Sequence, residues 1–199
     1  MIKSLYQHYQ ELIKEYGNPV EYWPQWCAKK KSVKEREKII IGMILVQRTS
    51  WHNANIALKN LKKADLLSIK KISQSESLEK LTELIRSAGF FQSKPRRLFD
   101  VCSFVVKKGG VGKLMKMDTS ELRSDLLEIK GVGQETADTI LLYALDKTVF
   151  IIDEYTRRWV DKKGISKKKD YIELQEIFQM KLKRDLMIYQ NFHALIIVC

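Results

Sequence analysis

The sequence contains few cysteines, only three prolines and no long apolar segment. Cys27, Cys102 and Cys199 are odd in number and far apart, which argues against a disulfide framework and for a reducing cytosol. The longest apolar run, IIIGMILV at 39–46, is far too short to cross a bilayer. No cysteine and histidine cluster has zinc-ligand spacing, and no phosphate-binding loop or dinucleotide fingerprint occurs.

Acidic residues are also scarce, because 24 Asp and Glu stand against 36 Lys and Arg and leave a net charge of +12. Such an excess favours a polyanionic partner, either nucleic acid or an anionic membrane surface. No single long basic amphipathic helix is present, so nucleic acid is favoured over a membrane. The N-terminal segment, MIKSLYQHYQELIKEYG, mixes charges into its apolar positions and is not a signal peptide. We therefore expect a cytoplasmic protein, associated with the nucleoid if the source is prokaryotic.

Helical periodicity dominates what is present. Apolar residues recur three and four positions apart in most of the chain, and glycines or capping residues separate these segments. The segment VFIID at 149–153 has strand-like composition, but it is isolated and lacks an alternating partner. The pattern predicts an all-α protein, with helices marked by Leu5–Tyr16, Val33–Gln47, Ala54–Leu61, Leu78–Ile85, Leu98–Val105, Leu122–Ile129, Ala137–Ala144 and Tyr171–Val198.

One short stretch, IKGVGQETAD at 129–138, sets two glycines one residue apart between two predicted helices. Glycine at such a turn permits a positive φ and the close approach of another backbone. The amide groups of the turn, together with those at the start of the second helix, form a site suited to a phosphate oxygen. The alternative is a helix connection that needs glycine only for its turn, and the motif by itself leaves both interpretations open.

Three segments together resemble a known family. LLEIKGVGQETADTILLYALDKTVFIIDEYTRR at 126–158 resembles the helix-hairpin-helix signature of the endonuclease III superfamily of DNA glycosylases. ILVQRTSW at 44–51 is similar to the family's glutamine-containing turn, and IRSAGFFQSKPRRL at 85–98 is similar to its segment with glycine, an aromatic pair and basic residues. The order and spacing of the three agree, so the resemblance covers about 39–192.

The resemblance implies an all-α, two-lobed helix-hairpin-helix glycosylase fold. Residues 33–147 would form a helical barrel domain ending in the hairpin, and 1–32 plus 148–199 a second helical lobe. Asp153 would be the catalytic carboxylate at the cleft between the lobes. Breaking an N-glycosidic bond builds positive charge on the sugar, which a fixed carboxylate stabilises, and the same group can activate water. Asp153 can also cap the helix that follows it, and the two roles are compatible.

The family pattern also implies how DNA is held. Backbone amides of the hairpin would grip a phosphate, with an alkali cation, K⁺ or Na⁺, held by carbonyls of Gly131 and Gly133. Gln47 and Arg48 would enter the duplex where the target nucleotide is flipped out, because the bond is otherwise inaccessible. The implied phosphate contacts at the hairpin are Lys130, Gly131, Val132, Gly133 and Thr136, and further basic candidates are Lys94, Lys147 and Arg157.

At one hairpin position the sequence departs from the bifunctional members of the family. They carry a lysine nucleophile directly before the Thr-Ala pair, where this chain has Glu135, and a carboxylate cannot form an imine. Monofunctional hydrolysis is therefore expected. Glu135, with Trp23 and Trp26 near the N-terminus, resembles the small 3-methyladenine DNA glycosylase branch. In that case the tryptophans and Glu135 would contact an electron-poor alkylated purine, although core packing and a favourable helix N-terminus explain these residues equally well.

Two rival functions remain open at this stage. One is an endonuclease III-like glycosylase of oxidised pyrimidines or mismatches, and the other is a non-catalytic helix-hairpin-helix DNA-binding module. In every case the expected partner is double-stranded DNA rather than a membrane, bound by a monomer.

The C-terminal part carries two further departures. Many relatives continue into four cysteines that bind an iron–sulfur cluster, but Cys199 falls too early to match the first, so no cluster ligands are expected within this chain. The chain is either naturally short or a fragment. The lysine that the 3-methyladenine branch has in the last helix is replaced by Leu195, and His193 beside it is expected to have no catalytic role.

Overall fold

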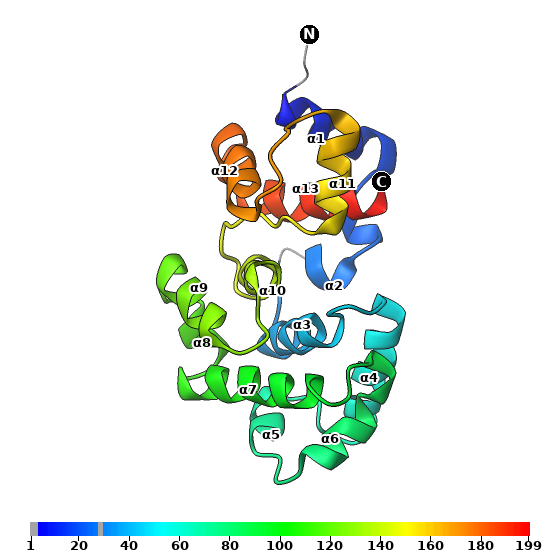
Figure 1. Cartoon of the computed structure of the whole chain (residues 1–199), viewed down its shortest axis with the longest axis vertical. Coiled ribbons are helices and arrows are strands. Elements are labelled where there is room, and N and C mark those ends of the chain that lie inside the picture. Colours follow the sequence, from blue (N-terminus) through cyan, green and yellow to red (C-terminus); the bar gives the residue numbers. More distant parts are fainter. Residues whose placement is uncertain (1–3, 28–29) are drawn as a thin grey trace. The chain divides into compact units, whose positions relative to one another are not determined.

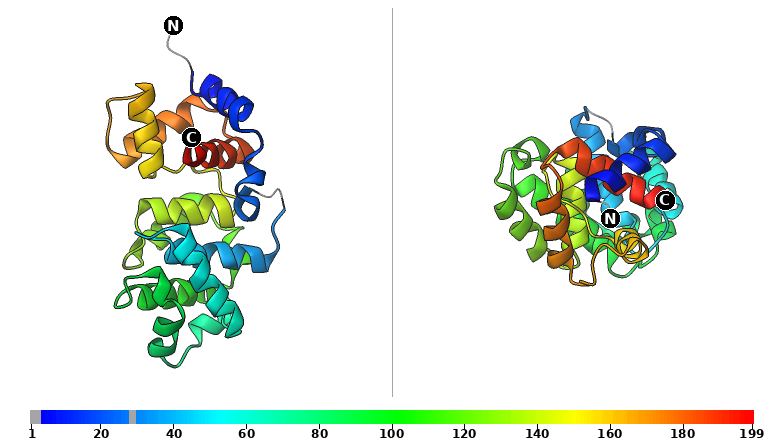
Figure 2. Two further views of the ribbon diagram at one scale, coloured as in Figure 1. Left: turned by 90° about the vertical axis from the view of Figure 1, so that its right-hand side faces the viewer. Right: turned by 90° about the horizontal axis from the view of Figure 1, so that it is seen from above.

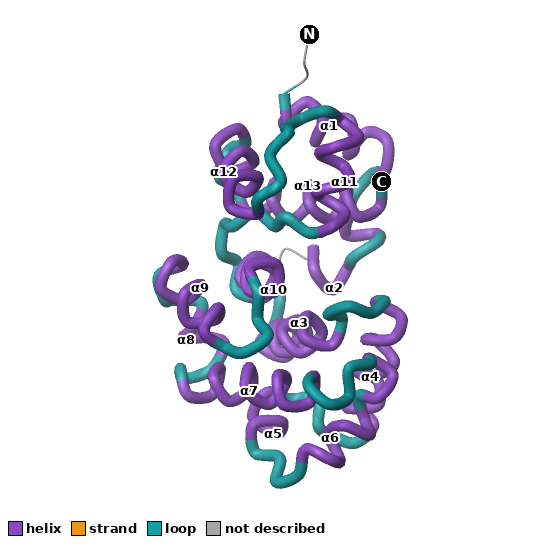
Figure 3. The backbone as a smooth tube through the Cα atoms, in the orientation of Figure 1, coloured by secondary structure: helices purple, strands orange, loops and turns teal. Residues whose placement is uncertain are grey.

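The structure is a computed structural model that describes residues 4–27 and 30–199. Every regular element in these two ranges is a helix (Figure 3). This confirms the all-α expectation, and 149–153 is an extended loop rather than a strand. Within the same ranges no helix is long and apolar enough to cross a membrane.

The chain divides into two compact units. The central unit is Lys31–Ile140, and the terminal unit combines Met1–Lys30 with Leu141–Cys199. The boundaries expected from the sequence, 32/33 and 147/148, lie two and seven residues further along the chain than these. The second division falls inside a π-helical turn, Ile140–Ala144, that directly continues the helix before it. No loop or linker therefore marks this boundary in the sequence.

The central unit is built around α3, whose residues from Ile39 to Leu45 are all buried. Gly42 allows this packing, because a Cβ there would lie 3.3 Å from the Trp51 ring. α3 packs against α4, α7, α8 and α10 (Figure 1). The elements of this unit are α3 (Val33–Leu45), α4 (Trp51–Lys63), α5 (Ile69–Ser73), α6 (Leu78–Leu84), the 3₁₀ turn Arg86–Ala88, α7 (Lys94–Lys107), α8 (Val111–Leu114), α9 (Thr119–Glu128) and α10 (Gln134–Thr139).

The terminal unit has an aromatic core. Phe150, Trp159, Phe178 and Phe192 are buried together, with ring centroids 4.3 to 6.4 Å apart. α13, red in Figure 2, packs against α1, α11 and α2. The elements are α1 (Leu5–Tyr16), the 3₁₀ turn Pro19–Glu21, α2 (Pro24–Cys27), α11 (Glu154–Lys163), α12 (Tyr171–Lys181) and α13 (Leu186–Val198).

Local capping sets where most of these helices begin. Ser4 and Ser32 form capping boxes with Gln7 and Glu35, as their spacing in the sequence favours. Ser50 caps α4 by accepting a hydrogen bond from the Asn53 amide. Aspartates cap four later helices through their side chains: Asp118 (α9), Asp153 (α11), Asp170 (α12) and Asp185 (α13).

Candidate active site and DNA-binding hairpin

The two hairpin glycines have different structural roles. Gly131 has φ +88°, a conformation that requires glycine, and a Cβ there would also displace the Arg97 guanidinium from its present place. Gly133 has φ −96° and ψ 179°, with no neighbouring heavy atom within 4 Å of a Cβ position. Its lack of a side chain leaves the start of α10 open, which is consistent with a ligand approaching the backbone there.

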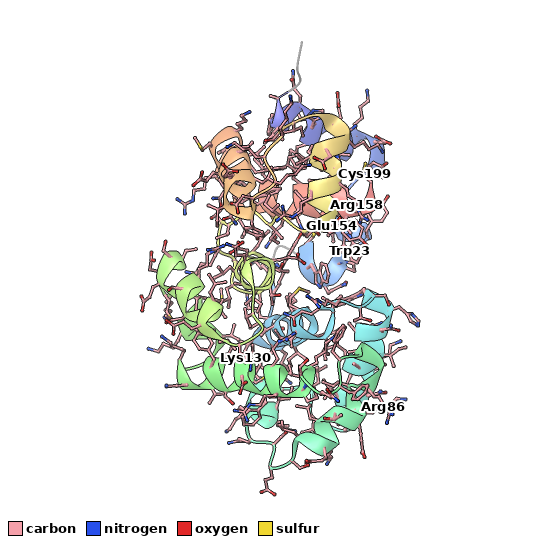
Figure 4. The ribbon with its side chains drawn as sticks, in the orientation of Figure 1. Trp23, Arg86, Lys130, Glu154, Arg158 and Cys199 are labelled. Carbon is pink, nitrogen blue, oxygen red and sulfur yellow. The ribbon has the colours of Figure 1, made fainter. Side chains whose placement is uncertain are left out.

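The hairpin amides are not all available to a phosphate. The Val132 amide donates to the Ile129 carbonyl at 2.9 Å, and the Val132 side chain is buried. The expectation that all three residues of the turn contact DNA is therefore corrected for Val132, whose amide closes the turn. Lys130, labelled in Figure 4, is exposed directly before Gly131.

The carbonyls proposed for an alkali cation already accept hydrogen bonds from the protein. The Gly131 carbonyl accepts from Nε2 of Gln47 at 3.2 Å, and the Gly133 carbonyl accepts from the Ala137 amide at 2.9 Å. A carbonyl oxygen has two lone pairs, so one hydrogen bond to each oxygen leaves it able to meet a cation. The alkali-cation site at Gly131 and Gly133 stays a prediction.

Gln47 is folded back onto the hairpin in this structure. Its Nε2 donates to Oγ1 of Thr136 at 2.8 Å as well as to Gly131, and its Oε1 accepts from the Arg97 guanidinium. A side chain expected to enter the duplex is thus held by three hydrogen bonds within the central unit. Entry of Gln47 into DNA would require these bonds to be exchanged for contacts with bases.

The same residues line a pocket of the central unit with a volume of about 560 Å³. Arg48 and Phe90 lie on its wall with φ of +54° and +49°, a conformation that side chains rarely adopt. Both are exposed, and strained exposed residues of this kind are common at functional surfaces. The lining residues are Gln47, Arg48, Phe90, Ser93, Arg97, Gly131, Gly133, Glu135 and Thr136.

Phe90 and Arg97 were not singled out from the sequence. The signal was present, since both lie in the segment IRSAGFFQSKPRRL, with its aromatic pair after Gly89 and its paired arginines. What the sequence does not give is which of the two phenylalanines and which of the arginines lie on the pocket.

Lys94, from the same segment, is not a phosphate contact. It is fully buried, and its Nζ donates to the carbonyls of Leu45, Gln47 and Ala88 at 2.7 to 2.9 Å. Burial lowers the pKa of Lys94 to about 8, and the charge of Arg97 acts in the same direction. Lys94 therefore joins the end of α3 and the Gln47 turn to the loop before Phe90.

In the terminal unit, Asp153 is the N-cap of α11. Its Oδ1 accepts from the Thr156 amide at 2.7 Å, and the residue is only 9% exposed. Burial acts to raise the pKa of Asp153, but the His193 imidazole and the Thr156 hydrogen bonds outweigh it and leave the pKa lower than usual. The result is a nearly buried carboxylate that stays ionised and is fixed in direction.

His193, to which the sequence assigned no role, faces this carboxylate. Its Nε2 lies 3.3 Å from Oδ2 of Asp153, and its Nδ1 lies 2.8 Å from the Tyr143 hydroxyl. All three side chains are buried in the terminal unit. A histidine 40 residues beyond an aspartate carries no local sequence signal of this contact, which depends on the packing of α13 against α11.

Trp23 and Trp26 are stacked on each other in the terminal unit. Their rings are 5.1 Å apart between centroids and inclined by 10°, and Trp26 also lies 5.6 Å from the Tyr143 ring. Trp26 is buried, whereas Trp23, labelled in Figure 4, is partly exposed. The Trp26 ring therefore packs in the core, and the Trp23 ring still has an exposed part that can contact a ligand. Core packing and base contact, the two interpretations given for these tryptophans, are compatible.

Over the described ranges, no group of three or more His, Cys, Asp or Glu side chains is placed to hold a metal ion. Cys27 and Cys102 are buried thiols, and Cys199 is exposed.

Comparison with known proteins gives a consistent result. Residues 41–184 match the family model described as HhH-GPD superfamily base excision DNA repair protein. Over 199 residues the chain is 43% identical to a protein of Methanocaldococcus jannaschii named provisionally as a DNA repair glycosylase, with 98% of this chain and 86% of that protein covered. It is 27% identical over 149 residues to endonuclease III of Thermotoga maritima, with 75% and 66% covered.

Solved structures show the same similarity. The Helicobacter pylori 3-methyladenine DNA glycosylase MagIII, bound to 1,N6-ethenoadenine, superposes with a TM-score of 0.75 at 28% identity, covering 94% of this chain and 90% of that one. A non-covalent endonuclease III–DNA complex superposes with a TM-score of 0.70 at 18% identity, covering 96% and 83%. At that identity the second likeness concerns the fold alone.

Proposed function

The chain belongs to the HhH-GPD superfamily of base excision DNA repair proteins, and on this premise we propose that it is a monofunctional DNA glycosylase that removes alkylated purines. The observation that carries the proposal is Asp153, a carboxylate held ionised and oriented at the start of α11. Its place in the sequence, after VFII and before EYTRR, matches the position of the catalytic aspartate in the family resemblance.

The chemistry assigned to Asp153 is hydrolysis of the N-glycosidic bond. As the bond breaks, its electron pair leaves on the base, and positive charge develops on the sugar next to the carboxylate. Water then adds to the sugar C1′, and its proton passes to Asp153 and on to solvent, which leaves an abasic site. An alkylated, cationic purine departs as a neutral base, so the protein has to supply little more than charge stabilisation and a positioned water.

DNA binding is assigned to the hairpin surface of the central unit. The amides of Gly131 and Gly133, the hydroxyl of Thr136 and the exposed Lys130 are the proposed phosphate contacts, supported by the open start of α10. We assign the duplex-facing role to the turn of Gln47 and Arg48. Exposed Phe90 joins that turn at the same pocket, where an aromatic ring can stack on bases.

Recognition of an alkylated purine is assigned to the aromatic pair and to Glu135. The partly exposed Trp23 ring, backed by Trp26, offers a flat surface to an electron-poor base. Glu135 adds a carboxylate that attracts a cationic one. The similarity to MagIII, which was solved with an alkylated adenine derivative, supports this class of substrate over oxidised pyrimidines.

The absence of lyase activity is proposed from the hairpin itself. A Schiff base requires an amine, and the pocket residues include Glu135 and two arginines but no lysine. The nearest buried amine, Lys94, is fully enclosed and engaged by three carbonyls. The expected product is therefore an intact strand with an abasic site that breaks only in alkali.

The test is base release from duplexes that carry 3-methyladenine, ethenoadenine, uracil, thymine glycol or a mismatch, scored for nicking before and after alkali. Asp153→Asn removes the charge but keeps a good helix cap, and Asp170→Asn, at the cap of α12, is the matched control. We expect purine release by the wild type and Asp170→Asn, with a loss of at least about 100-fold in Asp153→Asn. Release of oxidised pyrimidines alone, or nicking without alkali, would overturn the proposed specificity or the monofunctional chemistry.

A further inference from the structure

Three buried side chains of the terminal unit form a continuous polar chain inside an apolar core. The Tyr143 hydroxyl lies 3.1 Å from the Gln190 carbonyl and 2.8 Å from Nδ1 of His193, and Nε2 of His193 lies 3.3 Å from Oδ2 of Asp153. Nε2 has no aligned hydrogen-bond partner among the described residues, so its contact with Oδ2 is electrostatic. The carboxylate is thereby fixed from both sides, because its Oδ1 accepts from the Thr156 amide.

The positions of the protons in this chain follow from what each group can donate. When His193 is charged, Nδ1–H donates to the Tyr143 hydroxyl, which donates in turn to the Gln190 carbonyl. When His193 is neutral, the Asp153 carboxylate 3.3 Å from Nε2 favours a proton on that nitrogen. The Tyr143 hydroxyl can then rotate and donate to Nδ1, because a phenol both donates and accepts, so both charge states can keep a proton on Nε2.

We propose that His193 is a positioning residue that presents Nε2–H to Asp153 in both of its charge states, with the carboxylate favouring this tautomer and the Tyr143 hydroxyl accommodating it at Nδ1. This rests on the proposed function, since it concerns how the catalytic carboxylate is kept ionised. Without Nε2–H, the carboxylate would keep only the Thr156 hydrogen bonds against the cost of its burial. Burial also raises the pKa of Tyr143 far above its usual value, so the phenol stays neutral and available for either arrangement.

The other ionisable groups on the elements packed around His193 have contacts of their own. On α1, His8 has its ring 5.4 Å from that of Trp159 and its Nδ1 3.7 Å from Glu11. On α2, the buried Cys27 thiol contributes, after burial, to the raised pKa of Tyr143. Asp185, at the start of α13, accepts from the Ile188 amide, and the exposed Glu21 lies on the 3₁₀ turn that packs against α13. Asp153 is the acidic group whose contact with the His193 imidazole the structure defines.

The direct test is the tautomer of His193 by ¹H–¹⁵N correlation spectra of the full chain, with histidine labelled, from about pH 5 to 9. The chain has only three histidines, so His8→Phe and His52→Gln variants assign the signals. We expect Nε2 to carry a proton at every pH in this range. A neutral form protonated on Nδ1 would overturn the proposal. This measurement needs no substrate, so it decides the proposal even if no base is released.

The second test is the pH dependence of base release in His193→Phe and His193→Gln. Phenylalanine keeps the volume but has no donor, and glutamine keeps a neutral N–H. We expect the acidic limb of the profile to move up by at least about one pH unit in His193→Phe, and to be largely restored in His193→Gln. His8→Phe, at another buried histidine of the unit, should leave the limb in place.

The outcomes separate this inference from the proposed function. A rate that falls equally at every pH in His193→Phe would mean that His193 only fills space, which overturns the inference and leaves the glycosylase assignment intact. A wild type that releases no base from any duplex would overturn the proposed function. The spectra would still report whether Nε2–H faces Asp153.

Discussion

Replacing Lys94 with methionine should destabilise the protein, although it removes a charge from a fully buried position. Methionine keeps the length of the stem, so the change isolates the ammonium. The ammonium donates to the carbonyls of Leu45, Gln47 and Ala88. Leu45 ends α3, and the Thr49 amide that would continue the helix donates to Val46 instead. Lys94 therefore supplies the donor that the end of the helix lacks.

Two opposing terms set the magnitude for Lys94→Met. Hydrogen bonds from a charged donor contribute roughly 1.5–3 kcal/mol each. Against this, a fall in the lysine pKa from 10.5 to about 8 corresponds to a burial cost of roughly 3 kcal/mol. The hydrogen bonds win, and we expect a net loss of roughly 2–6 kcal/mol, or a melting temperature lower by at least about 4 °C.

The assay is thermal and denaturant unfolding of Lys94→Met beside Lys107→Met, an exposed lysine on the same helix that controls for charge and propensity. The pH dependence has a definite sign. Between about pH 8 and 10.5 the unfolded chain holds the Lys94 proton and the folded chain does not, so wild-type stability rises with pH through this term. The gap between wild type and Lys94→Met should widen over that range. Equal stability of Lys94→Met and Lys107→Met at pH 7 would refute the reasoning.

Three further predictions follow. Gly131→Ala should cost at least about 1 kcal/mol in unfolding experiments and weaken duplex binding in fluorescence anisotropy, because its φ is +88° and Arg97 fills the space, whereas Gly133→Ala should leave stability nearly unchanged. Glu135→Lys should add strand nicking without alkali to gel assays of lesion duplexes, because it supplies the missing amine; no gain would place this position away from the sugar. Because the pKa of Asp153 is lower in the folded chain than its ordinary 3.8, the ionised carboxylate stabilises the folded protein above pH 3.8, and this contribution is lost as pH falls through the folded-state pKa. In acid titrations the stability advantage of wild type over Asp153→Asn should therefore shrink toward pH 3.

Local features of the sequence were enough to predict most of the longer helices and much of the hairpin, but not the short helices α2, α5 and α8 or the break between α12 and α13. Helical periodicity, serine and aspartate caps, and glycines at turns act over three or four residues, so they can be identified without knowing the fold. The GVG turn, its place before α10 and the cap position of Asp153 were all accessible in this way. The charge excess likewise indicates a polyanionic partner, because net charge depends on composition alone.

Long-range packing decided two features that the sequence did not show. Lys94 looked like a phosphate contact in a basic segment, but its ammonium is enclosed by carbonyls that lie up to 49 residues away. Gln47 stays the residue predicted to enter DNA, but the sequence did not show that it is bound to groups 50 to 89 residues along the chain. No spacing rule reports such contacts, because they arise only when separate helices meet.

Short segments of the sequence were sufficient for the helical class and the family, and they singled out Asp153 as the proposed catalytic carboxylate. The groups that surround this carboxylate became known from the fold. His193 meets Asp153 across 40 residues of chain and Tyr143 across 50, and burial in a common core makes these few polar contacts strong. In this low-dielectric interior, the position of the His193 proton depends on the donors and acceptors that folding places beside each ring nitrogen.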